Sequence, residues 1–159
     1  MSENLETVGS ALGSVSSGLF VVTTSQDQKN HVMLASWVQQ AGFTPPSVSI
    51  VVSKERPISA LLTVGSPVVI NILGKGQGKL VGYFAKGFDP EINPLAEVPT
   101  AIAPSGQPYL QEAIAYLDAK VTQVVDTGDH NLVLAQIIGG ERLSDSEPAI
   151  HTRKNGFKY

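Results

Sequence analysis

The chain has 159 residues and a formal net charge of −3, with 11 basic and 14 acidic side chains spread along its length. This length fits a single domain, residues 1–159, with a sizeable core. The dispersed charge excludes the basic surface of a nucleic-acid or anionic-membrane binder, so we expect small molecules or proteins as partners. The absence of cysteine excludes disulfides, thiolate metal sites and cysteine nucleophiles.

The first residues lack the basic and apolar segments of a targeting signal. The longest apolar runs, such as Val68–Leu73, are far too short to cross a bilayer. The expected compartment is therefore the cytosol, with no membrane partner.

In chain order, the apolar spacing first predicts a short helix over Leu5–Val15, which Gly9 and Gly13 weaken so that packing must hold it. Segments rich in β-branched and aromatic residues then predict strands separated by polar or proline-containing turns. Pro57 suits the first turn of a helix, which we expect to continue through Leu62. The strands expected in this half are Gly18–Thr24, Val32–Gln40, Ser47–Ser53 and Ser66–Leu73, the last buried on both faces.

The second half begins with a glycine-rich stretch, Gly74–Lys79, which lacks the Gly-Lys-Ser/Thr ending of a phosphate-binding P-loop. A short amphipathic helix reaches Phe88, and the proline-rich segment Gly87–Gly106 then has the length of a lid or binding loop. The last two expected strands are Ala113–Val125, in which Leu117, Ala119, Val121 and Val125 share the buried phase opposite Asp118, Lys120 and Thr122, and Leu132–Ile138.

This order of elements favours a mainly β fold. At least six strands are interleaved with three short helices, and most connections suit antiparallel neighbours. A closed or partly closed β-barrel with helical covers is therefore expected. No Gly-x-Gly-x-x-Gly follows a strand, so a Rossmann dinucleotide-binding domain is disfavoured.

A tight turn, Gly128-Asp129-His130-Asn131, joins the last two expected strands. Gly and Asp are common in hairpin turns, so the turn by itself also has a purely structural interpretation. It nevertheless places an imidazole and a carboxylate in a loop held by flanking strands, where functional residues concentrate. We therefore take His130 as the candidate catalytic residue, with Asp129 as the group that sets its tautomer.

Two other segments carry candidate binding residues. Small and hydroxyl side chains beside Trp37 let a backbone approach a flat ligand, although they also occur where strands cross. Lys54 and Arg56 stand at an expected helix start, which suits a phosphate, although a solvated basic pair is the commoner interpretation. The histidines at positions 31, 130 and 151 lack ligand-like spacing, so no metal site is expected and a metal-dependent hydrolase is disfavoured.

In order and spacing, a set of short motifs resembles the flavin reductase family with the FMN-binding split-barrel fold. A finer resemblance, to the C-terminal flavin reductase domain of cyanobacterial flavodiiron proteins, rests on Met33–Gln40, Lys54–Ile58 and His151–Lys154. That resemblance would make the chain one module of a longer polypeptide. The motifs of the wider family are Phe20–Thr24, Met33–Trp37, Pro45-Pro46, Val69–Leu73, Phe84-Ala85, Gly106–Leu110, Gly128–His130 and Pro148.

The resemblance implies an antiparallel split β-barrel and an enzyme that moves a hydride from NADH or NADPH to FMN, or to FAD. It implies a homodimer with the flavin near the subunit interface, and His130 beside the nicotinamide or the reactive face of the flavin. The residues implied to bind the flavin are Met33, Leu34, Ala35, Ser36 and Trp37 along its ring, Lys54 and Arg56 at its phosphate, and Asn71, Phe84 and Ala85 near its ribityl chain and phosphate.

Two positions depart from the family's pattern. Many members have a Ser-x-Thr pair where the phosphate is held, but this chain has Arg56-Pro57-Ile58, whose cation would replace the hydroxyls by charge-assisted contacts. Val32 stands where the family has glycine. Two hypotheses therefore stay open. One is a flavin reductase module that feeds electrons to a fused flavodiiron oxygen-reducing core, and the other is a split-barrel dimerisation or docking domain with weak or no flavin binding.

Overall fold

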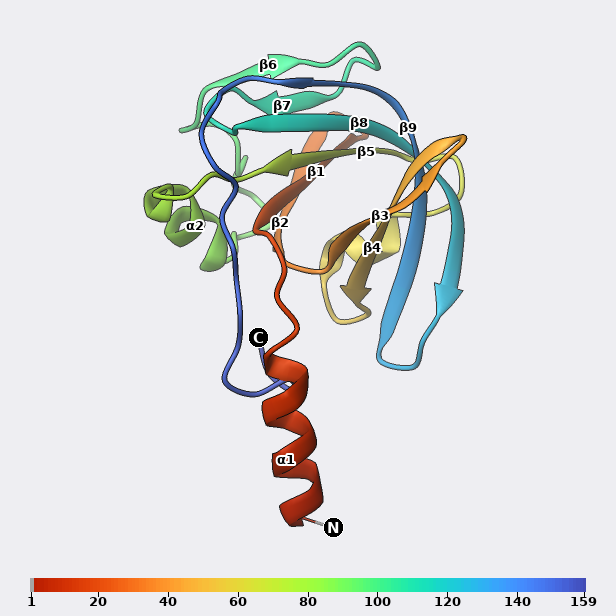
Figure 1. Cartoon of the computed structure of the whole chain (residues 1–159). Coiled ribbons are helices and arrows are strands. Elements are labelled where there is room, and N and C mark those ends of the chain that lie inside the picture. The colour runs from red at the N-terminus through yellow and green to blue at the C-terminus, as the bar shows by residue number, and fades with distance from the viewer. Residues whose placement is uncertain (1) are drawn as a thin grey trace.

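The structure, a computed structural model, describes residues 2–159 (Figure 1). These residues form one seven-stranded sheet in the order β2-β1-β5-β8-β9-β4-β3 and a separate pair, β6 and β7. The ladders are antiparallel, and the large sheet curls into a partly closed barrel (Figure 1), so the expected mainly β, antiparallel fold is confirmed. The strands are β1 (Phe20–Gln26), β2 (Lys29–Ala35), β3 (Val38–Phe43), β4 (Pro46–Ser53), β5 (Pro67–Ile72), β6 (Thr100–Ile102), β7 (Pro108–Leu110), β8 (Ala115–Asp126) and β9 (His130–Arg142).

The barrel closes at a corner between its two edge strands. β2 and β3 lie at opposite edges of the sheet, yet only Ser36 and Trp37 separate them in the chain. The edges therefore meet at this corner, where the main-chain N–H of Val51 donates to the carbonyl of Trp37 at 2.9 Å. The expected single strand Val32–Gln40 is wrong, because the chain passes from one edge of the sheet to the other at Ser36.

The barrel interior is filled by the inward faces of the central strands. Val68, Val69 and Ile70 of β5 are each fully buried, which confirms the expected burial of this strand on both faces. The helix expected after Pro57 is a single 3-10 turn, η1 (Pro57–Leu61), that helps to close one end of the barrel. The side chains of the main core are Val22, Met33, Ala35, Val48, Ile50, Val52, Ile58, Leu62, Val68, Ile70, Ala119, Val121, Val133 and Ala135.

A second cluster covers the outside of β1 and β2. The helix α2 (Gly78–Ala85) lies beside the barrel (Figure 1) and packs Leu80 and Phe84 against Val21 of β1. The long segment 87–106 joins this cluster through Leu95, and it contains β6, although no regular element was expected there. Proline does not prevent so short a strand, which pairs with β7. The segment therefore serves here as a packed cover of the barrel wall.

The alternation expected in β8 is only partly correct. Asp118 is fully buried instead of exposed, and Val125 is 38% exposed instead of buried. Irregular pairing at Asp118/Ala119 and again at Val121/Gln123 shifts the two faces of the strand. The buried carboxylate of Asp118 accepts hydrogen bonds from the main-chain N–H of Ser105 at 2.9 Å and from its hydroxyl at 2.7 Å.

Helix α1 (Ser2–Gly13) projects away from the barrel (Figure 1). Its presence is as expected, but its apolar side chains are not packed on the core, since Leu5 is 54% and Leu12 is 42% exposed. The two glycines provide its contact instead. The main-chain N–H of Arg153 donates to the carbonyl of Gly13 at 2.9 Å, and that of Gly156 donates to the carbonyl of Gly9 at 2.6 Å. None of the helices within residues 2–159 is long and apolar enough to cross a membrane.

Candidate functional site

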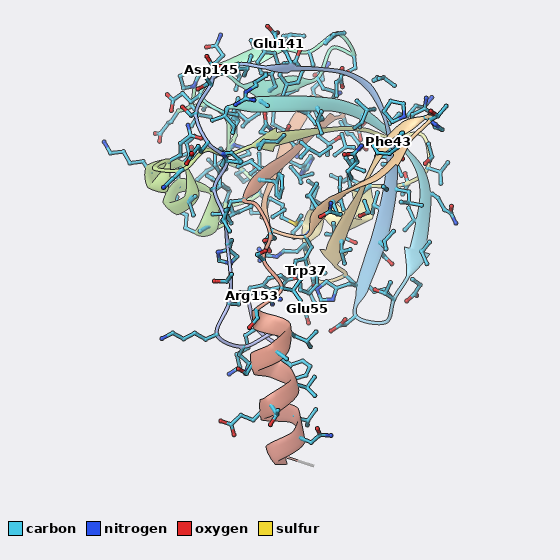
Figure 2. The ribbon with its side chains drawn as sticks, viewed as in Figure 1. Trp37, Phe43, Glu55, Glu141, Asp145 and Arg153 are labelled. Carbon is cyan, nitrogen blue, oxygen red and sulfur yellow. The ribbon has the colours of Figure 1, made fainter. Side chains whose placement is uncertain are left out.

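The corner between β2 and β3 places Trp37 on the outer surface, where α1 meets the barrel (Figure 2). Arg153, which arrives from the far end of the chain, lies beside it in the same view. Its guanidinium carbon lies 5.1 Å from the centre of the indole ring, within the range of a cation–π contact. The corner thus presents a large aromatic surface with a cation on it.

His130 enters the same place from the start of β9, where it pairs with Ser53. The turn before it is fixed on both sides. The main-chain N–H and the hydroxyl of Thr127 both donate to the carbonyl of His130 at 3.0 Å, and the N–H of Lys54 donates to the carbonyl of Asp129 at 3.0 Å. The imidazole is 15% exposed and its centre lies 4.9 Å from that of Trp37. The sequence-distant residues Trp37 and His130 therefore form one wall.

Both ring nitrogens of His130 have partners. Nδ1 lies 2.7 Å from a carboxylate oxygen of Asp129, and Nε2 lies 2.5 Å from the hydroxyl of Tyr159. An ionised carboxylate only accepts, so Nδ1 carries the proton and, in the neutral ring, Nε2 accepts from the phenol. Asp129 thus has the tautomer-setting position expected from the sequence. Its hydrogen bond with His130 holds the pKa of Asp129 below the ordinary value, whereas burial raises the pKa of Tyr159.

Two cavities adjoin this wall. The larger, of about 290 Å³, lies between Trp37, His130 and the last seven residues. The smaller, of about 30 Å³, lies against the backbone of the corner, Met33–Trp37. Tyr159 and Trp37 line both. The larger cavity is lined by Trp37, Val51, Thr127, Asp129, His130, Arg153, Gly156, Phe157, Lys158 and Tyr159, and the smaller by Met33, Leu34, Ala35, Ser36, Trp37, Val51, Val52, Ser53, Arg56 and Tyr159.

Positive charge gathers at the edge of these cavities. The guanidinium carbon of Arg56 lies 5.8 Å from the centre of the Tyr159 ring at the smaller cavity, and Arg153 adds a second guanidinium at the larger one. Lys54 lines neither cavity. Its ammonium forms an ion pair with Asp126 at 2.8 Å, which lowers the pKa of that carboxyl. The arrangement suits a planar ring that carries an anionic group, because guanidinium forks match phosphate oxygens.

The structure thus brings together most of the residues singled out in the sequence, namely Met33–Trp37, Arg56, Asp129 and His130. It does not bring Asn71, Phe84 or Ala85 to this place. Asn71 is fully buried, where its amide nitrogen donates to the carbonyl of Val21 at 2.9 Å and its oxygen accepts from the N–H of Leu110 at 2.7 Å. Phe84 is on the buried face of α2, in the cluster with Val21, and Ala85 is exposed at the end of that helix.

Sequence reasoning did not assign Arg153 or Tyr159 to the site. The only local signal was the mixture of basic and aromatic residues in the segment Arg153–Tyr159, and nothing in the chain order placed that segment beside Trp37. Among residues 2–159, the structure shows no group of three His, Asp or Glu side chains that could hold a metal ion.

The barrel and the corner at which its edges meet have the split-barrel fold of flavin reductases. Solved structures show the same fold. An NADH:FAD oxidoreductase of Streptomyces globisporus matches 90% of this chain and 85% of its own with a TM-score of 0.83 and 23% identity. The styrene monooxygenase flavin reductase of Pseudomonas putida matches 90% of each chain with a TM-score of 0.77 and 22% identity. The chain belongs to the flavin reductase-like domain family, which matches residues 12–158.

Curated relatives agree with the finer resemblance. Diflavin flavoprotein A 1 of Synechocystis sp. is 39% identical over 152 residues, which cover 94% of this chain and 26% of the relative. A Nostoc sp. relative whose name also contains diflavin flavoprotein is 41% identical over 154 residues, or 96% of this chain and 27% of its own length. The chain therefore spans about a quarter of the length of these relatives.

Proposed function

We propose that this chain is an NAD(P)H:flavin oxidoreductase module that binds FMN, with FAD as the alternative flavin. The observation that carries the proposal is the cleft at the corner Met33–Trp37, where the Trp37 indole, His130 and the Arg56 guanidinium line one site. Membership of the flavin reductase-like family supports it. When bound, the two cofactors supply the redox chemistry, a hydride passing from the nicotinamide to the flavin ring, while the protein aligns the rings.

The residues of the corner fit a flavin. Met33, Leu34, Ala35 and Ser36 line the smaller cavity. Their main chain and the hydroxyl of Ser36 would meet the polar edge of the ring. The indole of Trp37 offers the flat surface beside it, and aromatic pairs of this kind add to the area they bury. Arg56 would take the phosphate in place of the family's hydroxyls, since a charge-assisted contact is about twice as strong as a neutral one.

His130 would face the reacting rings. Asp129 fixes its tautomer, so Nε2 is the atom left to meet a ligand once the phenol of Tyr159 moves away. In the neutral ring this nitrogen accepts a hydrogen bond, as from a carboxamide N–H, and in the protonated ring it donates one. The neutral side chain would therefore orient the carboxamide of a nicotinamide, and the protonated side chain would stabilise negative charge on the flavin ring.

The test is an anaerobic titration. The purified chain is mixed with FMN, fluorescence quenching gives a stoichiometry and a dissociation constant, and NADH or NADPH is then added without oxygen. Tight one-to-one binding and loss of the oxidised flavin absorbance are expected. The variant His130→Gln should lower the reduction rate by about a hundredfold or more, the range that one positioned polar group contributes. The matched control His31→Gln, on β2, should leave it unchanged.

Failure of FMN to bind at high micromolar concentration would contradict the proposal and favour the second function, a dimerisation or docking domain. One observation supports that alternative: the apolar face of α1 is exposed, with Leu5 at 54% and Leu12 at 42%. A homodimer with the flavin near the subunit interface, and a fused flavodiiron core as electron acceptor, belong to the first proposal. The length of the diflavin relatives supports the fused core. The cytosolic location expected from the sequence stays a prediction.

A further inference from the structure

The segment Arg153–Tyr159 reaches the cleft along a path clamped by glycines. It follows the bridge between His151 and Ser17 and then runs along the side of α1. A Cβ added to Gly13 would lie 2.1 Å from the carbonyl oxygen of Arg153, and one added to Gly156 would lie 2.1 Å from the Cβ of Leu12. The two main chains therefore approach so closely only because both contact positions are glycine.

At the end of this path, the Tyr159 ring makes the contacts that a planar ligand would make. Its centre lies 5.4 Å from that of Trp37, its hydroxyl binds Nε2 of His130, and the Arg56 guanidinium lies over its face. An aromatic surface, an imidazole and a cation are thus all engaged by a ring that belongs to the chain itself. Any ring that reaches Nε2 of His130 must first displace this hydroxyl.

The cavity volumes lead to the same conclusion. The cavity at the corner holds about 30 Å³, roughly the share of one water molecule in the liquid, whereas small-molecule sites usually have about 300 Å³ or more. Tyr159 lines both this cavity and the neighbouring one of about 290 Å³. Removing its ring would join the two into one cleft that extends from the corner to His130.

The segment is held weakly enough to leave. Tyr159 is 65% and Phe157 is 55% exposed, so little apolar surface anchors them. The segment is held by the two main-chain bonds to α1, by the contact of Arg153 with Trp37 and by the contacts of the Tyr159 ring with His130 and Arg56. Within the segment, the Arg153 side chain donates to the carbonyls of Gly156 and Lys158 at 3.3 and 2.9 Å. Such a segment opens at a small fraction of the free energy of global unfolding.

We propose that the segment Arg153–Tyr159 is an internal competitor of the flavin: its phenol ring occupies the place where the flavin ring stacks, and the segment must swing away before flavin binds. The proposal rests on the flavin reductase function above and adds its regulation. The open state is the binding-competent one, so the apparent dissociation constant equals the intrinsic constant divided by the open fraction. Because α1 clamps the segment through Gly9 and Gly13, the position of α1 sets that fraction.

Two variants test the proposal from different places. Tyr159→Ala removes the competing ring, and Gly13→Ala breaks the clamp where α1 contacts the main chain of Arg153. Both should tighten FMN binding, by up to about threefold if the segment is closed in two-thirds of the molecules and by more if it is closed in a larger share. The matched control is Gly82→Ala on α2, where an added Cβ meets nothing within 4 Å. It should leave the FMN dissociation constant unchanged.

The emission of Trp37, the single tryptophan, supplies a second readout. Without flavin, both test variants should change it in the same direction, because Tyr159→Ala removes the phenol ring from the indole and Gly13→Ala displaces the segment that carries that ring. If the wild type binds FMN and NADH or NADPH reduces that flavin, weaker or unchanged FMN binding in Tyr159→Ala would contradict the competitor proposal. It would not contradict the reductase proposal. Absence of FMN binding in the wild type and in both variants would overturn both proposals.

Discussion

Replacement of Asn71 by alanine separates a structural role from a cofactor role. Asn71 is fully buried and joins three segments, through bonds to the carbonyl of Val21 at 2.9 Å, from the N–H of Leu110 at 2.7 Å and to the hydroxyl of Thr23 at 3.4 Å. Asn71→Ala removes the side-chain partner of two buried main-chain groups, at about 1–3 kcal/mol each. We expect a loss of about 3 kcal/mol of unfolding free energy and about 6–12 °C in Tm.

Urea unfolding followed by circular dichroism measures this loss, and FMN titration of the folded variant should give an unchanged dissociation constant. The control is Asn30→Ala, which removes an exposed amide bond to Asn93 of 3.1 Å and should cost less than about 0.5 kcal/mol. If Asn71→Ala unfolds within about 1 kcal/mol of the wild type and binds FMN more weakly, the buried-bridge reasoning is refuted. Asn71 would then hold the flavin, as the family resemblance implies.

Three further predictions follow from other parts of the fold. Gly140→Ala should lower the free energy of unfolding, measured by thermal unfolding, by at least about 1 kcal/mol, because the added Cβ would lie 2.7 Å from a carbonyl oxygen of β8. The control Gly139→Ala, whose added Cβ has contacts of 3.6 Å or more, should cost far less. Equal losses of stability in the two variants would contradict the clash. Phe84→Ala should cost about 3–5 kcal/mol with FMN affinity unchanged, as for a core residue, and weaker binding without destabilisation would contradict this. An NMR titration should show that the pKa of Asp129 is below its ordinary value and that His130→Gln raises it. The stabilisation by this carboxylate is therefore present at pH values above its ordinary pKa and is lost as the pH falls through the lowered pKa of the folded state. An unshifted pKa of Asp129 in the wild type would contradict the contact with His130.

The fold was predictable where one segment carries its own pattern. The apolar run of β5 and the alternation of β4 predicted buried strands, because burial on one or both faces determines which side chains a strand tolerates. The corner at Ser36 and Trp37 was not predictable, since no glycine or proline marks it. Its cause is the meeting of two sheet edges, which depends on strands far away in the chain. The burial of Asp118 was missed for a similar reason, because pairing with β9 shifts the strand.

The candidate site also has a part that was predictable from the sequence and a part that was not. The turn with Asp129 and His130 and the strand ending at Trp37 have local signatures, and family resemblance adds their roles. The contact between Tyr159 and His130 joins positions 29 residues apart, and the contact between Arg153 and Trp37 spans most of the chain. No periodicity or motif reports such contacts, because they arise from the path of the segment along α1.

The wide separation of these walls has a consequence for folding. The larger cavity takes its residues from positions 37, 51, 127–130 and 153–159, and the ladder between β4 and β9 joins chain segments far apart in sequence. Such non-local pairing has a high contact order and is typical of folding in milliseconds to seconds. The cleft exists only after these long loops have closed, so no partly folded chain offers it. A nucleotide that binds there selects the native state alone and should raise the unfolding free energy by about 2.7 kcal/mol at a hundred times its dissociation constant.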